Sequence, residues 1–243
     1  MTNPDRSLAS NVAMVLAAGI GKRMRPLTAT RPKPLVRVNG RALIDHSLDK
    51  LVEAGVSRAV VNVHYLPGQI EAHLAQRSAP ELSVSDERER LLETGGGMVK
   101  ALPLIDADPF FCLNSDNVWL DGPQNAFAAL SAAWDPTQMD ALLLLVSHAR
   151  AFNYTGRGDF HLDPLGQISR RKAGRVAPFI YTGIQIVSKR LLRDAPQDAF
   201  STGVLWDRAI AEGRLYGISH CGLWFEVGAP EMIAPTEAAL QRG

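Results

Sequence analysis

Apolar positions in the first two thirds of the chain form short runs that alternate with amphipathic stretches. Buried strands are predicted at residues 12–18, 58–63, 82–85, 110–114 and 141–147, and helices at residues 42–54 and 67–76. The first helix is expected to stop at Gly55, and the second has a proline in its first turn. Because strands that alternate with helices form parallel sheets covered on both faces, the pattern predicts an α/β fold with a mostly parallel sheet.

The pattern changes after about residue 149. Residues 157–170 alternate like a β-hairpin with Pro164 and Gly166 in its turn, and residues 179–187 read as another strand. Both are assigned to a smaller β-rich part. Strands at 215–219 and 223–227, a helix at 202–211 and a helix from Pro230 are predicted to close the chain. Without an internal repeat or a long linker, a single domain spanning residues 1–243 is expected, with a core at about 11–149 and a second part at about 150–243.

Composition narrows the possible partners. The 243 residues include 26 Lys and Arg against 25 Asp and Glu, a net charge of +1, so no overall field draws the protein to nucleic acid or to an anionic membrane. The apolar runs are far shorter than the roughly 20 residues that a membrane-spanning helix needs. Cys112 and Cys221 offer neither a metal-ligand spacing nor a disulfide framework. We therefore expect a cytoplasmic protein with no nucleic-acid or membrane partner.

The segment AAGIGKRMRPLTATRPKPLV, residues 17–36, carries the clearest chemical signal. A buried strand runs into Gly19 and Gly21, and five cations follow: Lys22, Arg23, Arg25, Arg31 and Lys33. Glycines let backbone N–H groups approach phosphate oxygens, and cations offset polyphosphate charge. The dinucleotide fingerprint would need a third glycine at the position of Met24, and a P-loop would need glycine at that of Leu16. A local polyphosphate site is predicted, with a basic surface turn as the alternative.

This segment resembles the signature of the sugar-1-phosphate nucleotidyltransferases, a glycine loop followed by R-M-x-P-L-T and P-K-P-L. Further matching blocks are LLETGGG at 91–97, N-x-D at 114–116, GRGDF at 156–160, YTGI at 181–184 and WFEVGAP at 224–230, so the resemblance covers nearly the whole chain. It implies a single nucleotidyltransferase domain with a Rossmann-like mixed, mostly parallel sheet and a small β-rich sugar-binding subdomain. It also implies an enzyme that joins a nucleoside triphosphate to a sugar-1-phosphate and works as a monomer or small homo-oligomer.

Two carboxylates are candidate Mg²⁺ ligands. Asp116 follows the strand expected at 110–113, at the carboxyl end where open α/β sheets bind ligands, and Glu226 follows the strand expected at 223–225. The resemblance implies that both hold a catalytic Mg²⁺. Two positions depart from the family pattern, which usually has glycine at Ser115 and aspartate at Glu226. A strand-end turn for Asp116, and a helix cap or ion pair for Glu226, are the structural alternatives.

The resemblance also assigns substrate contacts. Arg23 would neutralise the triphosphate and Lys33 would hold the α-phosphate or the attacking phosphate, as catalytic residues with Asp116. The triple glycine at 95–97 is expected in a nucleobase-binding loop that opens into a helix at 98–102. Expected substrate contacts are Ala17, Gly19, Gly21, Asn62, Glu93, Thr94, Gly95, Gly96 and Asn114 for the nucleotide, and Gly158, Asp159, Lys172, Thr182 and Gly183 for the sugar phosphate.

Several of these positions have competing interpretations. Lys172 lies in a basic hairpin that is equally typical of a solvated sheet edge, and His64 is as compatible with packing as with a ligand contact. The four tryptophans are expected mainly in the core, with Trp119 as an alternative wall of the sugar site.

Substrate identity follows from resemblance alone. It favours UTP and N-acetylmuramate-1-phosphate, in peptidoglycan recycling, over mannose-1-phosphate or heptose-1-phosphate guanylyl transfer or a cytidylyltransferase of isoprenoid or cofactor synthesis. A non-catalytic nucleotide-sugar-binding regulator is the alternative of another class. A flavin or nicotinamide oxidoreductase is disfavoured by the missing third glycine and the basic loop.

Overall fold

The computed structural model describes residues 8–242 and has a central mixed sheet, with nine strands in that part of the chain. Its parallel region has the order β6 (Phe110–Asn114), β1 (Val12–Leu16), β4 (Arg58–Val63) and β5 (Glu81–Asp86). The strand β12 (Phe179–Val187) runs antiparallel to β6 and also pairs with β8 (Ala141–Ser147). Beyond these lie β13 (Leu215–Ser219), parallel to β8, and the hairpin of β10 (Phe160–Leu162) and β11 (Ile168–Arg170).

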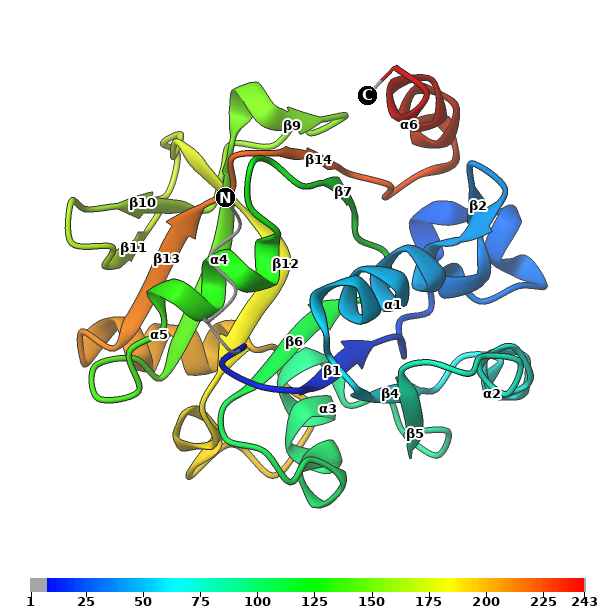
Figure 1. Cartoon of the computed structure of the whole chain (residues 1–243), viewed down its shortest axis with the longest axis horizontal. Coiled ribbons are helices and arrows are strands. Elements are labelled where there is room, and N and C mark those ends of the chain that lie inside the picture. The colour runs from blue at the N-terminus through cyan, green and yellow to red at the C-terminus, as the bar shows by residue number, and fades with distance from the viewer. Residues whose placement is uncertain (1–7, 243) are drawn as a thin grey trace.

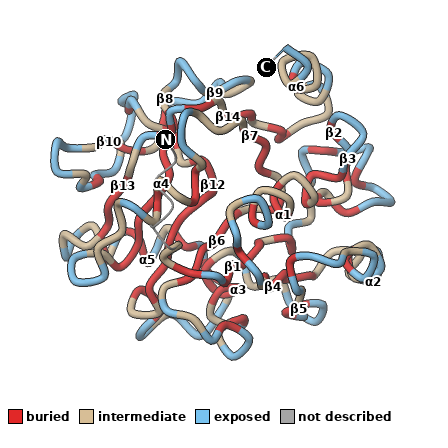
Figure 2. The backbone as a smooth tube through the Cα atoms, in the orientation of Figure 1, coloured by how far each residue is buried: buried red, intermediate tan, exposed pale blue. Residues whose placement is uncertain are grey.

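Helices cover both faces of this sheet, as Figures 1 and 2 show. On one face lie α1 (Leu43–Ala54), α2 (Pro67–Leu74) and α4 (Ala126–Ala133), and on the other α3 (Glu93–Ala101) and α5 (Gly203–Ala211). Successive strand residues point to opposite faces. Thus Ala13 and Val15 pack in the first core, whereas Val12 and Met14 pack in the second.

Two smaller sheets and several short helices lie outside the central sheet. A three-stranded sheet has the order β7 (Val118–Leu120), β14 (Leu223–Phe225) and β9 (Ala151–Phe152), and β2 (Arg37–Val38) pairs with β3 (Arg41–Ala42). The helix α6 (Ile233–Leu240) ends the chain. Short 3-10 helices lie at Lys22–Met24, Leu27–Ala29, Lys33–Leu35, Leu102–Leu104, His148–Arg150, Lys189–Leu192 and Pro230–Met232. A third core, which includes Met24, Val38 and Phe225, joins the glycine segment to β14.

Most predicted elements are confirmed, and the strands at 58–63, 110–114, 141–147, 179–187 and 215–219 have the predicted bounds. The strand at 179–187, expected in the smaller β-rich part, instead lies within the central sheet between β6 and β8. The helix α4 was missed, although Asn125 gives a capping signal: its side chain accepts hydrogen bonds from the amides of Phe127 and Ala128.

The predicted loop at residues 93–97 is wrong, because these residues form the first turns of α3. The three glycines are buried in the structure. Because glycine has no side chain, these three positions let α3 pack closely against its neighbours.

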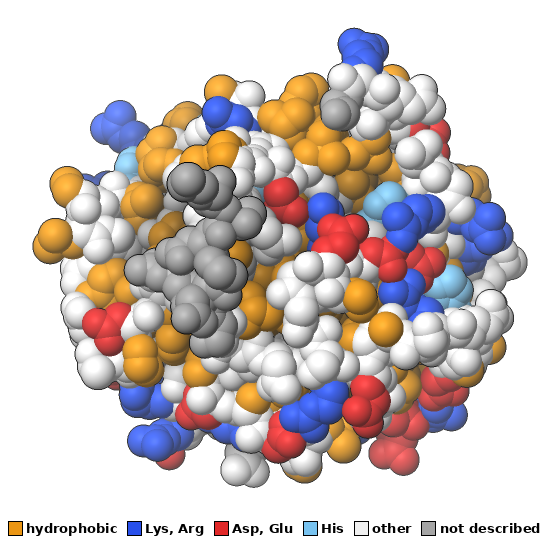
Figure 3. Space-filling view, viewed as in Figure 1, with side chains coloured by type: hydrophobic (Ala, Val, Ile, Leu, Met, Phe, Trp, Pro, Cys, Tyr) orange, Lys and Arg blue, Asp and Glu red, His pale blue; other side chains and the backbone are white. Residues whose placement is uncertain are grey.

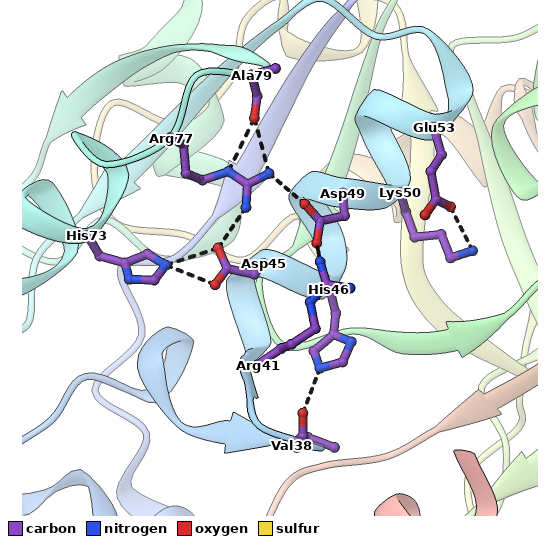
Figure 4. Close-up of polar contacts among 10 residues, drawn as sticks. All are labelled: Val38, Arg41, Asp45, His46, Asp49, Lys50, Glu53, His73, Arg77 and Ala79. Carbon is purple, nitrogen blue, oxygen red and sulfur yellow. Dashed lines mark hydrogen bonds and ion pairs between the residues drawn. The ribbon is translucent and has the colours of Figure 1, made fainter. Parts of the chain in front are cut away.

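A network of charged side chains joins α1 to α2 (Figure 4). Asp45 accepts hydrogen bonds from His73 and Arg77, and Arg77 also binds Asp49 at 2.7 Å. Figure 3 shows charges of both signs gathered over α1. The network stabilises the contact between two surface helices and lies outside the cavities described below. Among residues 8–242, no helix has the length and apolar character that a bilayer crossing requires.

Candidate active site

Three neighbouring parallel strands, β6, β1 and β4, end at one edge of the sheet, and residues at their carboxyl ends line a large cavity. This cavity of about 380 Å³ lies between the glycine segment and the start of α3. Eight of the expected site residues line it: Ala17, Gly19, Lys33, Asn62, Glu93, Thr94, Asn114 and Asp116. The prediction that strand-end residues converge here is therefore confirmed for β1, β4 and β6.

Two smaller hollows adjoin this cavity, and Lys33 and Asp116 line all three. One, of about 140 Å³, includes Arg23, Thr182, Gly183 and Glu226 among its lining residues, with Asn114. The other, of about 300 Å³, is lined by the glycine segment, including Gly21 and Lys22. Lys33 and Asp116 thus lie at the junction of the three cavities, where both could contact a ligand in any of them.

The glycine segment is shaped by contacts between its own residues. Gly21 has a φ of 67°, a left-handed conformation that favours glycine, and a Cβ there would lie 2.8 Å from Cβ of Lys33. The Thr28 hydroxyl donates a hydrogen bond to the Gly21 carbonyl at 2.8 Å. Gly21 therefore lets the loop fold back onto Lys33, which directs the lysine into the cavities. Arg25 and Arg31 are exposed and line none of the three.

Each candidate metal carboxylate is paired with a cation. Lys33 Nζ forms a hydrogen-bonded ion pair with Asp116 Oδ2, and Arg23 Nη1 lies 3.6 Å from Glu226 Oε1. The side chains of Asp116 and Glu226 are 31% and 23% exposed and line the same hollow. Both carboxylates are therefore accessible to solvent and to a bound ligand.

The donor set fits a magnesium ion. Mg²⁺ is typically held by one or two carboxylates, with substrate phosphates and water completing its octahedron. Within residues 8–242, no group of three or more His, Cys, Asp or Glu side chains forms a complete metal cage. Two accessible carboxylates beside two cations suit an ion that arrives with a polyphosphate.

The start of α3 forms one wall of the large cavity through Glu93 and Thr94. Glu93 has a φ of 59°, an uncommon conformation for a residue with a side chain. Gly95 and Gly96, expected to contact the nucleobase, do not line the cavity: both amides donate to the Phe200 carbonyl, at 2.9 and 3.2 Å. A side chain at Gly95 would collide with the Phe200 ring. These two glycines therefore allow the 194–202 segment to pack on α3.

The residues expected to contact the sugar phosphate are only partly brought together. Thr182 and Gly183 line the 140 Å³ hollow. Gly158 and Asp159 line none of the three cavities: the Gly158 amide donates to the Tyr154 hydroxyl, and Asp159 Oδ2 accepts from the Tyr181 amide at 2.9 Å. Asp159 thus holds the start of the hairpin against β12, whereas the Gly158 contact stays within residues 154–158. Lys172 is exposed on a turn and also lines none of the cavities.

Other lining residues were not found from the sequence. Asn117 is buried and donates from Nδ2 to the Gly183 carbonyl at 3.2 Å, and Ser201 lines the large cavity. Asn117 follows Asp116 closely, which was a usable signal, whereas nothing near Ser201 indicated a site. Trp224 packs in the core, as predicted, yet its ring also borders the small hollow. Trp119 packs against Phe127, which confirms a core role.

Two tyrosines near the sugar side are held in their neutral form. Burial, with a smaller contribution from the charge of Asp159, raises the pKa of Tyr154. Burial also raises the pKa of Tyr181 well above its ordinary value of 10.0. Neither phenol is a ready base at neutral pH.

Comparison with known proteins identifies the family. The family model described as "Nucleotidyl transferase" matches residues 12–155. N-acetylmuramate alpha-1-phosphate uridylyltransferase of Caulobacter vibrioides is 46% identical over 238 residues, which cover 96% of this chain and 98% of that protein. The protein of the same name from Neisseria meningitidis is 34% identical over 89% of this chain and 92% of its own length.

A solved structure supports the same fold. UDP-glucose pyrophosphorylase complexed with UDP-glucose superposes with a TM-score of 0.79, at 13% identity, over 96% of this chain and 99% of that one. The resemblance inferred from the glycine segment and the later motifs is therefore confirmed. The chain belongs to the nucleotidyl transferase family.

Proposed function

We propose that this protein transfers a uridylyl group from UTP to N-acetylmuramate-1-phosphate, giving a UDP-sugar and pyrophosphate. The observation that carries the proposal is the position of Lys33 and Asp116, which line the large cavity and both adjoining hollows. The nucleotide would occupy the large cavity and the sugar phosphate the hollow beside Thr182 and Gly183. UTP and N-acetylmuramate-1-phosphate are favoured because the Caulobacter and Neisseria relatives, 46% and 34% identical, carry that activity in their names.

The reaction is a single displacement. An oxygen of the sugar-1-phosphate attacks the α-phosphorus of UTP, a new P–O bond forms, and the bond to the β-phosphate breaks to release pyrophosphate. The attacking phosphate is already an anion at neutral pH, so no side chain has to remove a proton. Catalysis then depends on alignment and on charge neutralisation.

The chain's own residues supply both effects. Lys33, whose side chain is only 14% exposed, would hold the α-phosphate or the attacking phosphate between the cavities. Arg23, with a side chain 75% exposed, would reach the outer phosphates of the triphosphate. Each cation would exchange its carboxylate partner for a phosphate when the substrates bind.

Asp116 and Glu226 would then hold Mg²⁺. When bound, the ion would offset phosphate charge and polarise the phosphoryl group. The carboxylates must first separate from Lys33 and Arg23, so both ion pairs belong to the substrate-free state. In the same proposal, residues of about 11–149 bind the nucleotide and residues of about 150–243 complete the sugar site.

The test is pyrophosphate release from UTP, GTP, CTP, dTTP and ATP, each with N-acetylmuramate, mannose and N-acetylglucosamine 1-phosphates, with and without Mg²⁺. Magnesium-dependent release with UTP and N-acetylmuramate-1-phosphate is expected. Release with GTP and mannose-1-phosphate instead would keep the mechanism and replace both substrates. No turnover with any pair, together with tight nucleotide binding, would favour a non-catalytic role.

We further propose that the reaction takes place in the cytoplasm and serves peptidoglycan recycling. N-acetylmuramate is a cell-wall sugar, and both cysteines of the described residues are free thiols, as expected of a protein in a reducing compartment. A strain that lacks the protein should accumulate N-acetylmuramate-1-phosphate when it degrades its own cell wall.

A further inference from the structure

Glu87 is a buried carboxylate that the mechanism above does not use. It directly follows β5, is 0% exposed, and forms no ion pair with any residue of the described part of the chain. A charged group that is buried without a counter-charge is costly unless hydrogen bonds compensate it. Its position close to the large cavity, but outside its lining, calls for a physical explanation.

Hydrogen bonds connect Glu87 to both sides of the nucleotide cavity. Glu87 Oε1 accepts from Asn62 Nδ2 at 2.7 Å, and Asn62 Oδ1 accepts from the Ala17 amide at the same distance. Glu87 Oε2 accepts from the amide of Leu92, the residue before α3, at 3.1 Å. The side chain therefore links the end of β1 to the turn that carries Glu93 and Thr94 into the cavity.

The donors and acceptors in this chain allow one orientation of the Asn62 amide. A carboxylate only accepts and a backbone N–H only donates, so Nδ2 must face Glu87 and Oδ1 must face Ala17. The Ala17 amide is consequently occupied, which leaves other groups of the cavity to bind the nucleobase. Without the carboxylate, Asn62 Nδ2 would lose its acceptor, and only the Ala17 amide would hold the side chain.

Two neighbours hold Glu87 in place. Gly97 packs so closely that a Cβ there would lie 2.8 Å from both Asn62 Nδ2 and Glu87 Oε1. His64 binds the Glu87 carbonyl through Nδ1 at 2.8 Å, which places this histidine in a supporting role rather than at a ligand. The third glycine of the triple is therefore explained by packing: without a side chain at Gly97, α3 can lie directly on the hydrogen-bonded pair of Asn62 and Glu87.

We propose that Glu87 is a positioning residue for nucleotide recognition, acting through Asn62 and Leu92 to set the spacing of the two walls of the large cavity. The proposal rests on the proposed function, because it assumes that the nucleotide occupies this cavity. It predicts that disturbing Glu87 weakens nucleotide binding more than it slows the chemical step. Lys33 and Asp116 do not contact Glu87 and keep their own partners.

The test exchanges the two side-chain types. In Glu87→Gln the new amide places its NH₂ against either Asn62 Nδ2 or the Leu92 amide, so two donors face each other. In Asn62→Asp two carboxylates face each other. Each single variant should raise KM for UTP about tenfold and change kcat less than about threefold, the size typical of one mispaired buried contact.

The double variant Asn62→Asp/Glu87→Gln restores every pairing. One oxygen of the new carboxylate at position 62 accepts from the Ala17 amide, and its other oxygen accepts from the NH₂ of the new amide at position 87. The oxygen of that amide accepts from the Leu92 amide. KM for UTP should return to within about threefold of the wild-type value, because contacting residues are strongly non-additive. Rescue by the pair would not be expected from two independent losses of stability.

The matched control is Asp86→Asn, which alters the adjacent but exposed carboxylate that pairs with Arg88. Its KM should stay within about twofold of wild type. An unchanged KM in Glu87→Gln, or a double variant as impaired as the two singles combined, would overturn the inference. Melting curves identify any single variant that does not fold. In that case the KM of the double variant for UTP tests the inference.

Failure of the proposed function gives a different result. If the wild-type protein releases no pyrophosphate, UTP binding measured by calorimetry replaces KM in the same four variants. A protein that binds UTP with the expected pattern of loss and rescue would keep the inference and remove the catalytic proposal. No UTP binding by the wild-type protein would overturn both.

Discussion

The two sides of the site are built in different ways. The side proposed for the nucleotide is formed by the ends of neighbouring strands and by the glycine segment, and Asn62 is hydrogen-bonded there to both Ala17 and Glu87. The side proposed for the sugar phosphate is assembled from residues far apart in the chain: Asn117, Thr182, Gly183, Trp224 and Glu226. Its hollow is also smaller, about 140 Å³ against about 380 Å³.

This difference suggests a division of labour. A side built from buried, hydrogen-bonded groups is preorganised and binds a ligand of fixed shape at low entropic cost. A small, polar hollow bordered by the exposed Arg23 and the ion-paired Glu226 has to rearrange when its ligand arrives. Variants on the two sides should therefore fail differently, and variants of shared residues should fail most.

Asp116→Asn should have the largest effect, because Asp116 belongs to both sides. We expect kcat to fall about 1000-fold, since the variant removes a charge placed where phosphate charge develops. Stability should change little, because the ion pair with Lys33 is partly solvated. Pyrophosphate release and thermal melting measure the two quantities.

The control for this variant is Asp106→Asn, which neutralises an exposed carboxylate that forms an ion pair with Arg58. It should keep wild-type turnover. If Asp116→Asn raised only KM for the sugar phosphate and left kcat intact, the shared role of Asp116 would be wrong.

Glu226→Gln tests the carboxylate that lines the small hollow. The exchange keeps the shape and removes the charge, so we expect kcat to fall about 30-fold, less than for Asp116 because Glu226 lines only the small hollow among the three cavities. Glu226→Asp should retain most activity if the carboxylate itself matters. Both variants are compared by the Mg²⁺ concentration that gives half-maximal rate, which should rise in Glu226→Gln; an unchanged value would assign Glu226 to its ion pair with Arg23.

Gly95→Ala and Gly19→Ala separate a packing glycine from a cavity glycine. A Cβ at Gly95 overlaps the Phe200 ring, so the free energy of unfolding should fall by about 1–3 kcal/mol. A Cβ at Gly19 would have no neighbour within 4 Å, so the free energy of unfolding should change by less than about 0.5 kcal/mol. Because Gly19 lines the large cavity, the added methyl group should raise KM for UTP. Urea unfolding and steady-state kinetics give both numbers, and equal stability losses would contradict this division.

Much of the fold could be predicted because its core strands are continuous apolar runs. The length of the apolar run 141–147 favours a strand over a helix, and β8 has those bounds. The strand β12 was found but misplaced, since a strand's partners depend on contacts far along the chain: Ile184 is paired with Leu113. Sequence pattern identifies a strand more easily than its neighbours in the sheet.

The site shows the same limit. Lys33 and Asp116 were predicted because each lies in a dense local motif next to a strand. Glycines were harder to assign, because a glycine signals close approach without identifying the approaching group. Gly19 faces the open cavity, whereas Gly95 packs against Phe200 and Gly97 against the Asn62–Glu87 pair. Ser201 reaches the large cavity only through tertiary packing of the 194–202 segment, which no local pattern reveals.

Two histidines, one in each part of the chain, should make stability depend on pH. Burial lowers the pKa of His46, on α1, and of His220, between β13 and β14, below the ordinary value of 6.5. Arg41 and Asp45 face the first imidazole, and Asp121 and Arg150 the second. The unfolded chain then binds protons first, so the stability that these neutral imidazoles contribute is complete above about pH 6.5 and is lost as pH falls below it.

Melting temperatures at pH 7.5 and pH 5.5 test this expectation. His46→Gln and His220→Gln should each reduce the acid-induced drop by about 2 °C. A single transition that shifts in both variants indicates that the two parts of the chain unfold together. If neither variant reduces the drop, these two imidazoles are not the groups that set the pH dependence.

Lys172→Ala should have the smallest effect. The hairpin that carries Lys172 is on the sugar side by sequence, yet the side chain is exposed and its residue lines none of the cavities. We expect KM for the sugar phosphate to change less than about twofold, as for other solvated lysines. Arg171→Ala provides a comparison within the same hairpin, because Arg171 binds the Gly158 carbonyl at 2.9 Å and should affect stability instead. A tenfold rise in KM for Lys172→Ala would mean that the hairpin closes over the bound sugar, and the sugar side would then be completed by its ligand rather than by the fold.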